Sequence, residues 1–203
     1  GAGPYTVGPD TNASLPLMSR ALTGQLFWPT NAPGPTPAIV VGHGFARTSA
    51  QMENWGTHLA SHGFAVAVLD FPSRFAPDHA QNAIYMLEAL DYLRSGPAAV
   101  TARIDPMGGA LVGHSAGGLS AILASAQDAT LTAVVGLDPV DTPAGPGVAA
   151  APMVRAPTVV LGAEGSACNS RGSAINFYNA LNATGSWYVR IVGSTHCAGE
   201  DPR

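Results

Sequence analysis

The sequence predicts an α/β protein in which a mainly parallel, twisted sheet is covered by helices on both faces. Short apolar runs alternate with segments whose apolar residues recur at helical spacing, and strand and helix alternate five times. The apolar runs end abruptly at Gly, Asp or His, as buried parallel strands do where they enter loops. Because functional groups in such a sheet gather at the carboxyl ends of its strands, polar residues at these points are candidate site residues.

The composition is that of a globular domain. With 203 residues the chain can bury a core of its own, so we expect one domain spanning residues 1–203. Charged residues make up 11%, the formal net charge is −4 and there is no lysine, which argues against a nucleic-acid partner. No apolar run approaches the roughly 20 residues that cross a bilayer, so we expect no membrane span. We also expect a monomer.

The individual elements follow from local patterns. β-Favouring runs at residues 5–7 and 24–28, separated by Pro, Asn and Gly, predict an antiparallel sheet edge. Apolar runs predict the remaining strands at residues 38–41, 65–69, 110–112, 133–137, 158–161 and 187–192. Helical spacing, with Asp78 as one N-cap, predicts helices at residues 49–62, 78–94, 117–126 and 169–181. Residues 142–152 are rich in Ala, Gly and Pro, which predicts a flexible loop beside the site.

A G-x-S-x-G pattern at residues 113–117 follows the third buried strand. Small residues on both sides allow a strand to turn sharply into a helix, with the middle residue held out at the tip. Ser115 occupies that tip, beside a helix N-terminus whose N–H groups favour developing negative charge, and we interpret it as a nucleophile. The expected oxyanion donors are the backbone N–H groups of Ala116 and of Phe45, which lies in the glycine loop after the first buried strand.

His196 follows the last predicted strand and is the candidate general base. The chain order of nucleophile, acid and histidine is the one expected for a serine held on a strand-to-helix turn. His43 and His114 also follow strands, but we expect His43 to brace the glycine loop and His114 to point away from the nucleophile. His58 and His62 have a spacing that can bind a metal ion, yet no third ligand lies near them in the sequence, so we predict no metal site.

Three carboxylates are candidates for the acid that orients His196. Asp138 lies directly at a strand end, where its backbone is held rigidly, and we favour it for that reason. Glu164 follows the penultimate strand, and Asp141 lies three residues beyond Asp138. Both remain alternatives.

The two cysteines are Cys168 and Cys197. They are either free thiols or a disulfide that ties two late loops together, and we predict the disulfide because few other residues can brace these loops. Closing the loop adds about 3 to 4 kcal/mol of stability on the chain-entropy model. A disulfide implies an oxidising compartment, so we predict a secreted protein. No segment of the sequence has the layout of a signal peptide. If the protein is secreted, we therefore expect its signal peptide to have been removed already.

The chain resembles polyester hydrolases of the PET hydrolase and cutinase type. The similar segments are GPYTV at 3–7, FWPTNAPG at 27–34, WGTHLASHGFAVAVLD at 55–70, GHSAGG at 113–118 and the histidine-cysteine pair at 196–197. The resemblance implies that Ser115 is the nucleophile and His196 the base. It also implies that Phe45 takes the place of the aromatic oxyanion residue that packs on the substrate.

Two positions depart from the pattern of these hydrolases. Their acid follows the penultimate strand, and the matching position here is Ser166, which cannot act as an acid. The segment GLDPVD at 136–141 is instead similar to chlorophyllases, whose acid precedes the proline, and this resemblance maps the acid to Asp138. Val140 stands where the polyester hydrolases have a tryptophan that lines the substrate cleft. We therefore expect Val140 on the cleft wall.

The residues and the resemblance together predict an α/β-hydrolase fold without a large lid. They predict a serine carboxylic-ester hydrolase that works through an acyl-enzyme on short-chain or polymeric esters. No metal or organic cofactor is expected. The alternatives are a chlorophyllase-like or other small-molecule esterase, and a catalytically silent binding protein of the same fold.

Overall fold

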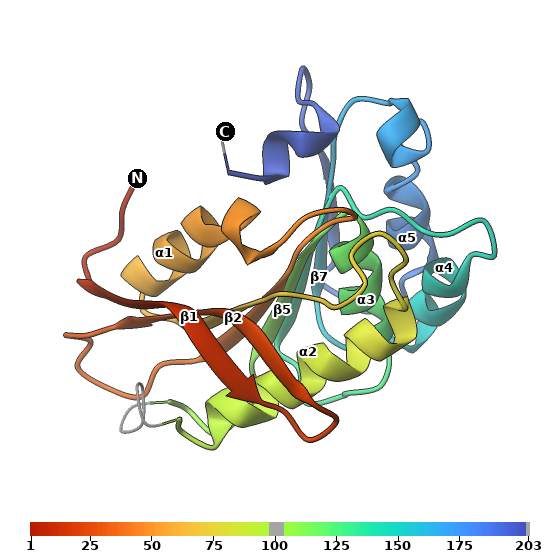
Figure 1. The fold of residues 1–203 in the computed structure, drawn as a ribbon. Helices are drawn as coiled ribbons and strands as arrows, with labels where there is room; N and C mark the ends of the chain where they lie inside the picture. The colour runs from red at the N-terminus through yellow and green to blue at the C-terminus, as the bar shows by residue number, and fades with distance from the viewer. Residues whose placement is uncertain (98–103, 202–203) are drawn as a thin grey trace.

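The computed structural model describes residues 1–97 and 104–201, and the strands within these ranges form one sheet (Figure 1). Their order across the sheet is β1-β2-β4-β3-β5-β6-β7-β8. The strands are β1 Val7–Pro16, β2 Ala21–Pro29, β3 Ala38–Gly42, β4 Ala65–Leu69, β5 Ala110–His114, β6 Ala133–Leu137, β7 Thr158–Gly162 and β8 Trp187–Arg190. The α-helices are α1 Glu53–Ser61, α2 His79–Arg94, α3 Ala116–Ser125, α4 Pro146–Ala150 and α5 Ile175–Ala180. Short 3-10 helices are η1 Ser49–Gln51, η2 Ala151–Met153, η3 Ala167–Asn169 and η4 His196–Gly199.

The strands from β3 to β8 run parallel, whereas β1 and β2 form an antiparallel edge. Gly42 of β3 is in register with Gly113 of β5, and His114 of β5 is in register with Leu137 of β6. The carboxyl ends of these strands therefore meet at one edge, and the loops that follow them lie together. This mainly parallel sheet confirms the predicted fold class.

Helices cover both faces of the sheet (Figure 1). Helix α1 packs against β1, β2 and β4 on one face, and α2 and α3 pack on the other, with α4 and α5 beside α3. Side chains alternate between the two faces, so that Ile39 and Val41 join the core under α1 while Val40 joins the core under α2. The central strands are apolar throughout because both of their faces are buried.

Several elements have the predicted bounds, and the first strand does not. β4 and β6 span the predicted residues, and the carboxylate of Asp78 caps α2 by accepting the Gln81 N–H at 3.0 Å. β1 extends from Val7 to Pro16, although only residues 5–7 were predicted. The pairing of β1 with β2 is irregular between Asp10 and Ala13. This irregularity and the polar residues around it hide the alternation of buried residues from the sequence pattern.

The helix predicted over residues 169–181 is wrong in its first half. Helix α5 begins only at Ile175. Ser170, Arg171 and Gly172 have φ values of 50°, 63° and 84°, which a right-handed helix does not allow. The chain therefore makes a left-handed turn before α5.

The flexible loop predicted at residues 142–152 is also wrong, because α4 and η2 occupy much of it. The carboxylate of Asp141 accepts the N–H groups of Gly147 at 3.2 Å and of Val148 at 2.9 Å, which satisfies donors at the start of α4. A Cβ on Gly147 would lie 2.5 Å from both Leu119 and Phe177, so glycine allows this helix to pack closely. Among the described residues, no helix is long and apolar enough to cross a membrane.

Candidate active site

The turn after β5 holds Ser115 in a conformation that few residues adopt. Its φ is 53° and its ψ is −116°, and α3 begins at the next residue. A Cβ on Gly113 would lie 2.2 Å from the carbonyl oxygen of Gly117, and a Cβ on Gly117 would lie 2.4 Å from that of Gly42. Both positions require glycine because backbone passes directly against backbone. The turn thereby fixes Ser115 at the N-terminus of α3.

Ser115, His196 and Asp138 form one hydrogen-bonded chain in the loops that follow β5, β8 and β6. His196 Nε2 lies 2.9 Å from Ser115 Oγ, and His196 Nδ1 lies 2.6 Å from Asp138 Oδ2. A carboxylate can only accept, so Nδ1 carries the proton of the neutral ring and Nε2 accepts the serine hydroxyl. In this tautomer, Nε2 is free to take the proton of Ser115.

Asp138 is held by three hydrogen-bond donors and has a φ of 44°. Its Oδ1 accepts the Ala163 N–H at 3.0 Å, and its Oδ2 accepts the side-chain amide of Asn169 at 2.9 Å in addition to His196. Burial raises the pKa of the Asp138 carboxyl, but the hydrogen bonds from His196, Asn169 and Ala163 outweigh burial and leave the pKa below its ordinary value. Asp138 is therefore ionised at neutral pH.

The two alternative acids are bound to other groups. Glu164 pairs with Arg190 and accepts the N–H of Gly193, and these contacts lower the pKa of its carboxyl. The carboxylate of Asp141 is engaged at the start of α4. Of the three candidate carboxylates, only that of Asp138 contacts His196.

Asn169 is a site residue that the sequence reasoning missed. It is fully buried, and its amide nitrogen donates to Asp138 Oδ2 and to the carbonyl of Glu164, both at 2.9 Å. Its side-chain oxygen accepts the N–H of Ser166 at 2.7 Å, in a capping-box arrangement at the start of η3. The spacing of Ser166 and Asn169 was the available signal. Ser166 occupies the position to which the resemblance to polyester hydrolases assigns the acid. Here it helps to place the Asn169 amide that donates to Asp138.

The loop after β3 presents Phe45. In residues 1–97 and 104–201, no protein acceptor receives the N–H of Phe45 or of Ala116. His43 braces this loop, as predicted, because its Nδ1–H donates to the Gly44 carbonyl at 2.8 Å and its Nε2 accepts the Phe71 N–H at 3.0 Å. Burial lowers the pKa of His43, which favours the neutral ring that this pair of contacts requires.

His114 contacts the turn that carries His196, a role that the sequence reasoning missed. Its predicted orientation away from Ser115 stays a prediction. Its Nε2–H donates to the carbonyl of His196 at 2.8 Å, and the centroids of the two rings lie 4.8 Å apart. Side chains alternate along β5, so His114 shares the α1 face of the sheet with Val112. The turn that carries His196 packs at the end of that face, and His114 is 1% exposed beneath it.

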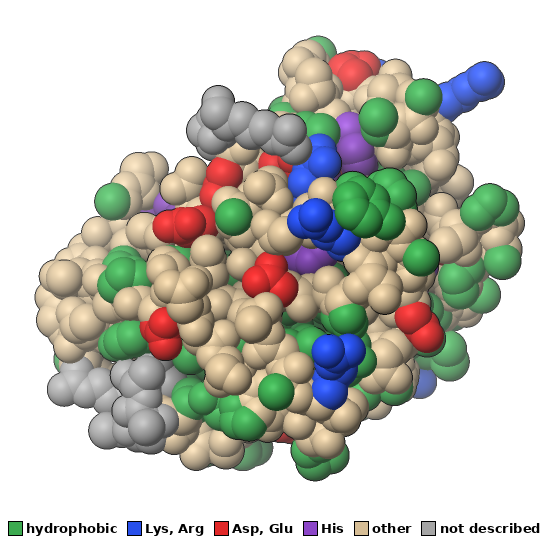
Figure 2. All heavy atoms as spheres, in the orientation of Figure 1, with side chains coloured by type: hydrophobic (Ala, Val, Ile, Leu, Met, Phe, Trp, Pro, Cys, Tyr) green, Lys and Arg blue, Asp and Glu red, His purple; other side chains and the backbone are tan. Residues whose placement is uncertain are grey.

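A cavity of about 370 Å³ opens beside Ser115, between the Phe45 loop and the turn of His196. Phe45 is 54% exposed, and its ring packs edge-on against Phe75 with centroids 6.3 Å apart. Figure 2 shows histidine, arginine and large apolar side chains next to one another in the upper part of the view. The cavity therefore combines the exposed ring of Phe45 on its rim with the hydroxyl of Ser115 in its lining.

Val140 is not among the residues that line this cavity. Its N–H donates to the carbonyl of Ser115 at 3.2 Å, which places its backbone against the serine turn. The expectation that the Val140 side chain forms the cleft wall stays a prediction.

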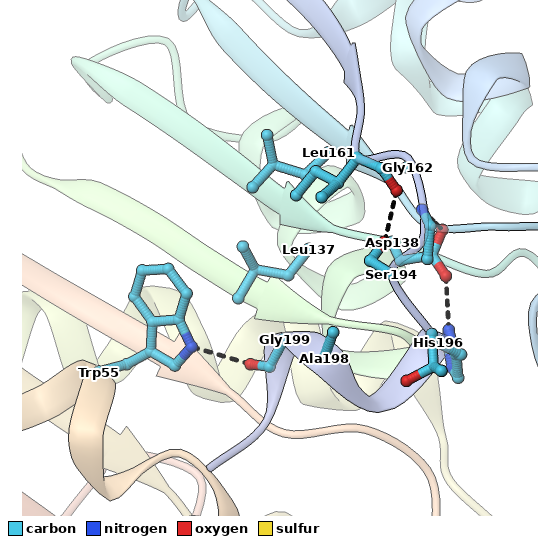
Figure 3. A pocket seen from close by; sticks show the side chains of 12 residues that line it. Trp55, Leu137, Asp138, Leu161, Gly162, Ser194, His196, Ala198 and Gly199 are labelled. Atoms are coloured by element: carbon cyan, nitrogen blue, oxygen red, sulfur yellow. Dashed lines mark hydrogen bonds and ion pairs between the residues drawn. The ribbon is translucent and has the colours of Figure 1, made fainter. Parts of the chain in front are cut away.

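A second cavity of about 260 Å³ adjoins Asp138 and His196 (Figure 3). Leu137 and Leu161 line its wall, and Trp55 lies at the end away from His196.

The predicted disulfide between Cys168 and Cys197 is wrong, since both are unbonded and exposed. Both thiols line the Ser115 cavity. The two late loops are braced by another route: Asn169, next to Cys168, donates to Asp138, and Asp138 binds His196, next to Cys197. Without a disulfide, the two cysteines do not indicate an oxidising compartment.

Within the described ranges 1–97 and 104–201, no three His, Cys, Asp or Glu side chains come together closely enough to hold a metal ion. His58 and His62 face each other with ring centroids 4.6 Å apart.

The parallel sheet, its two helical layers and the strand–turn–helix at Ser115 define a protein of the α/β-hydrolase fold. More closely, the chain matches the PET hydrolase-like family over residues 1–201 and belongs to that family.

Individual relatives are esterases by name. The chain is 32% identical over 198 residues to a bis(hydroxyethyl) terephthalate hydrolase of Streptomyces coelicolor, covering 96% of this chain and 61% of that protein. It is 30% identical over 224 residues to cutinase 2 of Thermobifida cellulosilytica, covering 99% of this chain and 82% of the relative. It is also 30% identical to cutinase cut1 of Thermobifida fusca, covering 99% and 67%. The chain thus spans less than two thirds of the Streptomyces hydrolase.

Proposed function

We propose that this chain is a serine carboxylic-ester hydrolase of the cutinase and polyester hydrolase type, with Ser115, His196 and Asp138 as its catalytic triad. The observation that carries the proposal is the hydrogen-bonded chain from Ser115 Oγ through His196 to an ionised Asp138. Family membership and the named relatives support the same reaction class.

The first half of the reaction forms an acyl-enzyme. Ser115 Oγ attacks the ester carbonyl while His196 Nε2 takes its proton, and Asp138 stabilises the imidazolium that results. The N–H groups of Phe45 and Ala116, which have no protein acceptor among the described residues, donate to the oxyanion. The intermediate then collapses, and His196 returns the proton to the departing alcohol.

The second half repeats these roles with water. His196 takes a proton from a water molecule, which attacks the acyl carbon and forms a second oxyanion in the same place. Collapse of this intermediate breaks the bond to Ser115, which regains its proton from His196, and a carboxylic acid leaves. The reaction needs no cofactor, because every proton transfer uses a residue of the triad.

The rim of the cavity indicates which substrates can reach Ser115. The exposed rings of Phe45 and Phe75 form an apolar border beside Ser115, and no helical lid covers the cavity in the described residues. An open site of this kind suits short-chain esters and segments of polyesters, with Val140 proposed on the cleft wall. We propose that residues 1–203 work as one domain and as a monomer. Secretion stays a prediction.

The test is turnover of p-nitrophenyl butyrate together with labelling of the purified protein by a fluorophosphonate. We expect turnover, and we expect covalent labelling at Ser115 that Ser115→Ala removes. A protein that is folded yet inert in both assays is a binding protein of the same fold, and the proposal then fails. A panel of tributyrin, a polyester film and a chlorophyll ester separates the cutinase-like activity from the chlorophyllase-like alternative.

A further inference from the structure

Glu200 is a buried carboxylate that the proposed mechanism does not use. Its side chain is 5% exposed, although it lies only four residues beyond His196. Arg47 Nε donates to both carboxylate oxygens, at 2.8 and 2.9 Å, and the other near contact is His114 Nδ1 at 3.3 Å. Burial of a charged carboxylate is costly unless it is paired, so this arrangement needs a reason.

Apolar packing contributes little to holding the turn that carries His196. η4 contains no buried residue. It is fastened by polar contacts instead: on the α1 side, the Trp55 indole N–H donates to the Gly199 carbonyl at 2.8 Å. In addition, His114 donates to the His196 carbonyl and Arg47 binds Glu200. The position of His196 therefore depends on these contacts.

The contacts of His114 identify its protonation state. Its Nε2 carries a proton because it donates to a carbonyl. Burial lowers the pKa of His114, which keeps the ring neutral and leaves a lone pair on Nδ1. This lone pair faces a carboxylate oxygen of Glu200, so His114 and Glu200 do not attract each other directly. The guanidinium of Arg47 offsets the negative charge of Glu200, and this allows His114 and Glu200 to lie close together.

We propose that Glu200 is a positioning residue for His196. Through Arg47, Glu200 ties the turn of His196 to the loop that carries the Phe45 N–H. Because Glu200 lies 3.3 Å from His114 Nδ1, it limits the movement of the imidazole ring that donates to the His196 carbonyl. Glu200 thus keeps the base, the oxyanion loop and the end of β5 in one arrangement. This inference rests on the proposed triad.

The expected consequence falls on kcat rather than on KM. Glu200 borders the Ser115 cavity, but its side chain is only 5% exposed, so its loss removes little substrate contact. Displacing His196 from Ser115 Oγ slows proton transfer, and a misplacement of about 1 Å costs about a hundredfold in rate.

The experiment compares Glu200→Ala with Glu200→Gln on p-nitrophenyl butyrate. We expect Glu200→Ala to lower kcat about tenfold to a hundredfold, with KM within about twofold. The rate of fluorophosphonate labelling at Ser115 should fall in parallel. We expect Glu200→Gln to retain most of kcat, since its amide oxygen can accept from Arg47 while its NH₂ group donates to His114 Nδ1.

The matched control is Glu164→Gln, which removes a carboxylate that also pairs with an arginine but contacts neither His114 nor the loop of Phe45. It should leave kcat unchanged. Circular dichroism and thermal unfolding establish that each variant is folded. If Glu200→Ala fails to fold, Arg47→Gln tests the same link and should lower kcat with little change in KM.

The outcomes separate the two proposals. Folded wild-type protein without turnover or labelling overturns the proposed function. Active wild-type protein whose Glu200→Ala variant keeps its kcat and labelling rate, and loses only thermal stability, overturns the positioning role alone. Equal losses of kcat in Glu200→Ala and Glu200→Gln also contradict it, because the inference requires rescue by glutamine.

Discussion

The turn of Ser115 and the turn of His196 meet where Ser115 Oγ lies 2.9 Å from His196 Nε2, yet the two turns are built in opposite ways. Ser115 sits between β5 and α3, where glycines at 113 and 117 let backbone pass against backbone. His196 sits in a 3-10 turn without a buried residue, held by side chains from α1, β5 and the loop after β3. The proposed nucleophile is therefore placed by local backbone geometry, and the proposed base by long-range polar contacts.

The largest expected effect on activity comes from removing the hydrogen bond between Asp138 and His196. Asp138→Asn replaces the acceptor of the His196 Nδ1–H with a group that can present an N–H, which favours the wrong tautomer of the ring. We expect kcat for p-nitrophenyl butyrate to fall by about a thousandfold or more, with the fold retained. The contrasting variant is Glu164→Gln, and a comparable loss in that variant would move the acid to the loop after β7.

Disturbing the glycine packing of the Ser115 turn should instead lower the free energy of unfolding. In Gly117→Ala, the new Cβ would lie 2.4 Å from the Gly42 carbonyl oxygen and 2.6 Å from that of His43, and neither backbone group can move freely. We expect a loss of about 3 kcal/mol in the free energy of unfolding, measured by denaturant titration. Gly34→Ala is the control, because nothing lies within 4 Å of its Cβ position. Equal stability of the two variants would contradict the backbone argument.

A smaller effect should appear as a pH dependence of stability. Burial lowers the pKa of both His43 and His114 in the folded protein below the ordinary value of 6.5. Below about pH 6.5 the unfolded chain takes up protons that the folded chain refuses, so the unfolded state is favoured as the pH falls. The stabilisation is complete above pH 6.5 and is lost progressively toward the lowered pKa values.

Thermal unfolding between pH 8 and pH 5 measures this dependence. We expect the melting temperature to fall with pH, and His43→Asn or His114→Asn to flatten the fall. A melting temperature that rises as the pH falls from 7 to 5 would show that other groups dominate.

The smallest effect concerns the cysteines that border the two turns. Cys168 and Cys197 are exposed and unbonded, so both thiols should react with a disulfide reagent in the native protein, without denaturant. Their alanine variants should change the free energy of unfolding by less than about 1 kcal/mol, because exposed side chains contribute little. A count of zero free thiols under denaturing conditions would restore the disulfide.

Prediction from sequence succeeded where a residue acts through its own local pattern. The strands at 65–69 and 133–137 and the cap at Asp78 have the predicted positions, since apolar runs and capping chemistry are local signals. It failed at residues 169–181, where left-handed residues interrupt a helical pattern, and at 142–152, where Asp141 satisfies the start of a helix in a segment that reads as a loop.

The candidate site divides in the same way. Sequence reasoning selected Ser115, Asp138 and His196, which the structure joins in one hydrogen-bonded chain. It missed Asn169, Arg47 and Glu200, and it predicted a disulfide where the two loops are linked through Asp138 instead.

The sequence by itself determined the parallel sheet and the serine turn, because the period of apolar residues and the placement of glycines act over a few residues. Only the tertiary structure decided which carboxylate meets His196 and what holds its turn. Those contacts join residues up to 153 positions apart, as between Arg47 and Glu200, and their geometry arises only when the sheet brings the strand ends together.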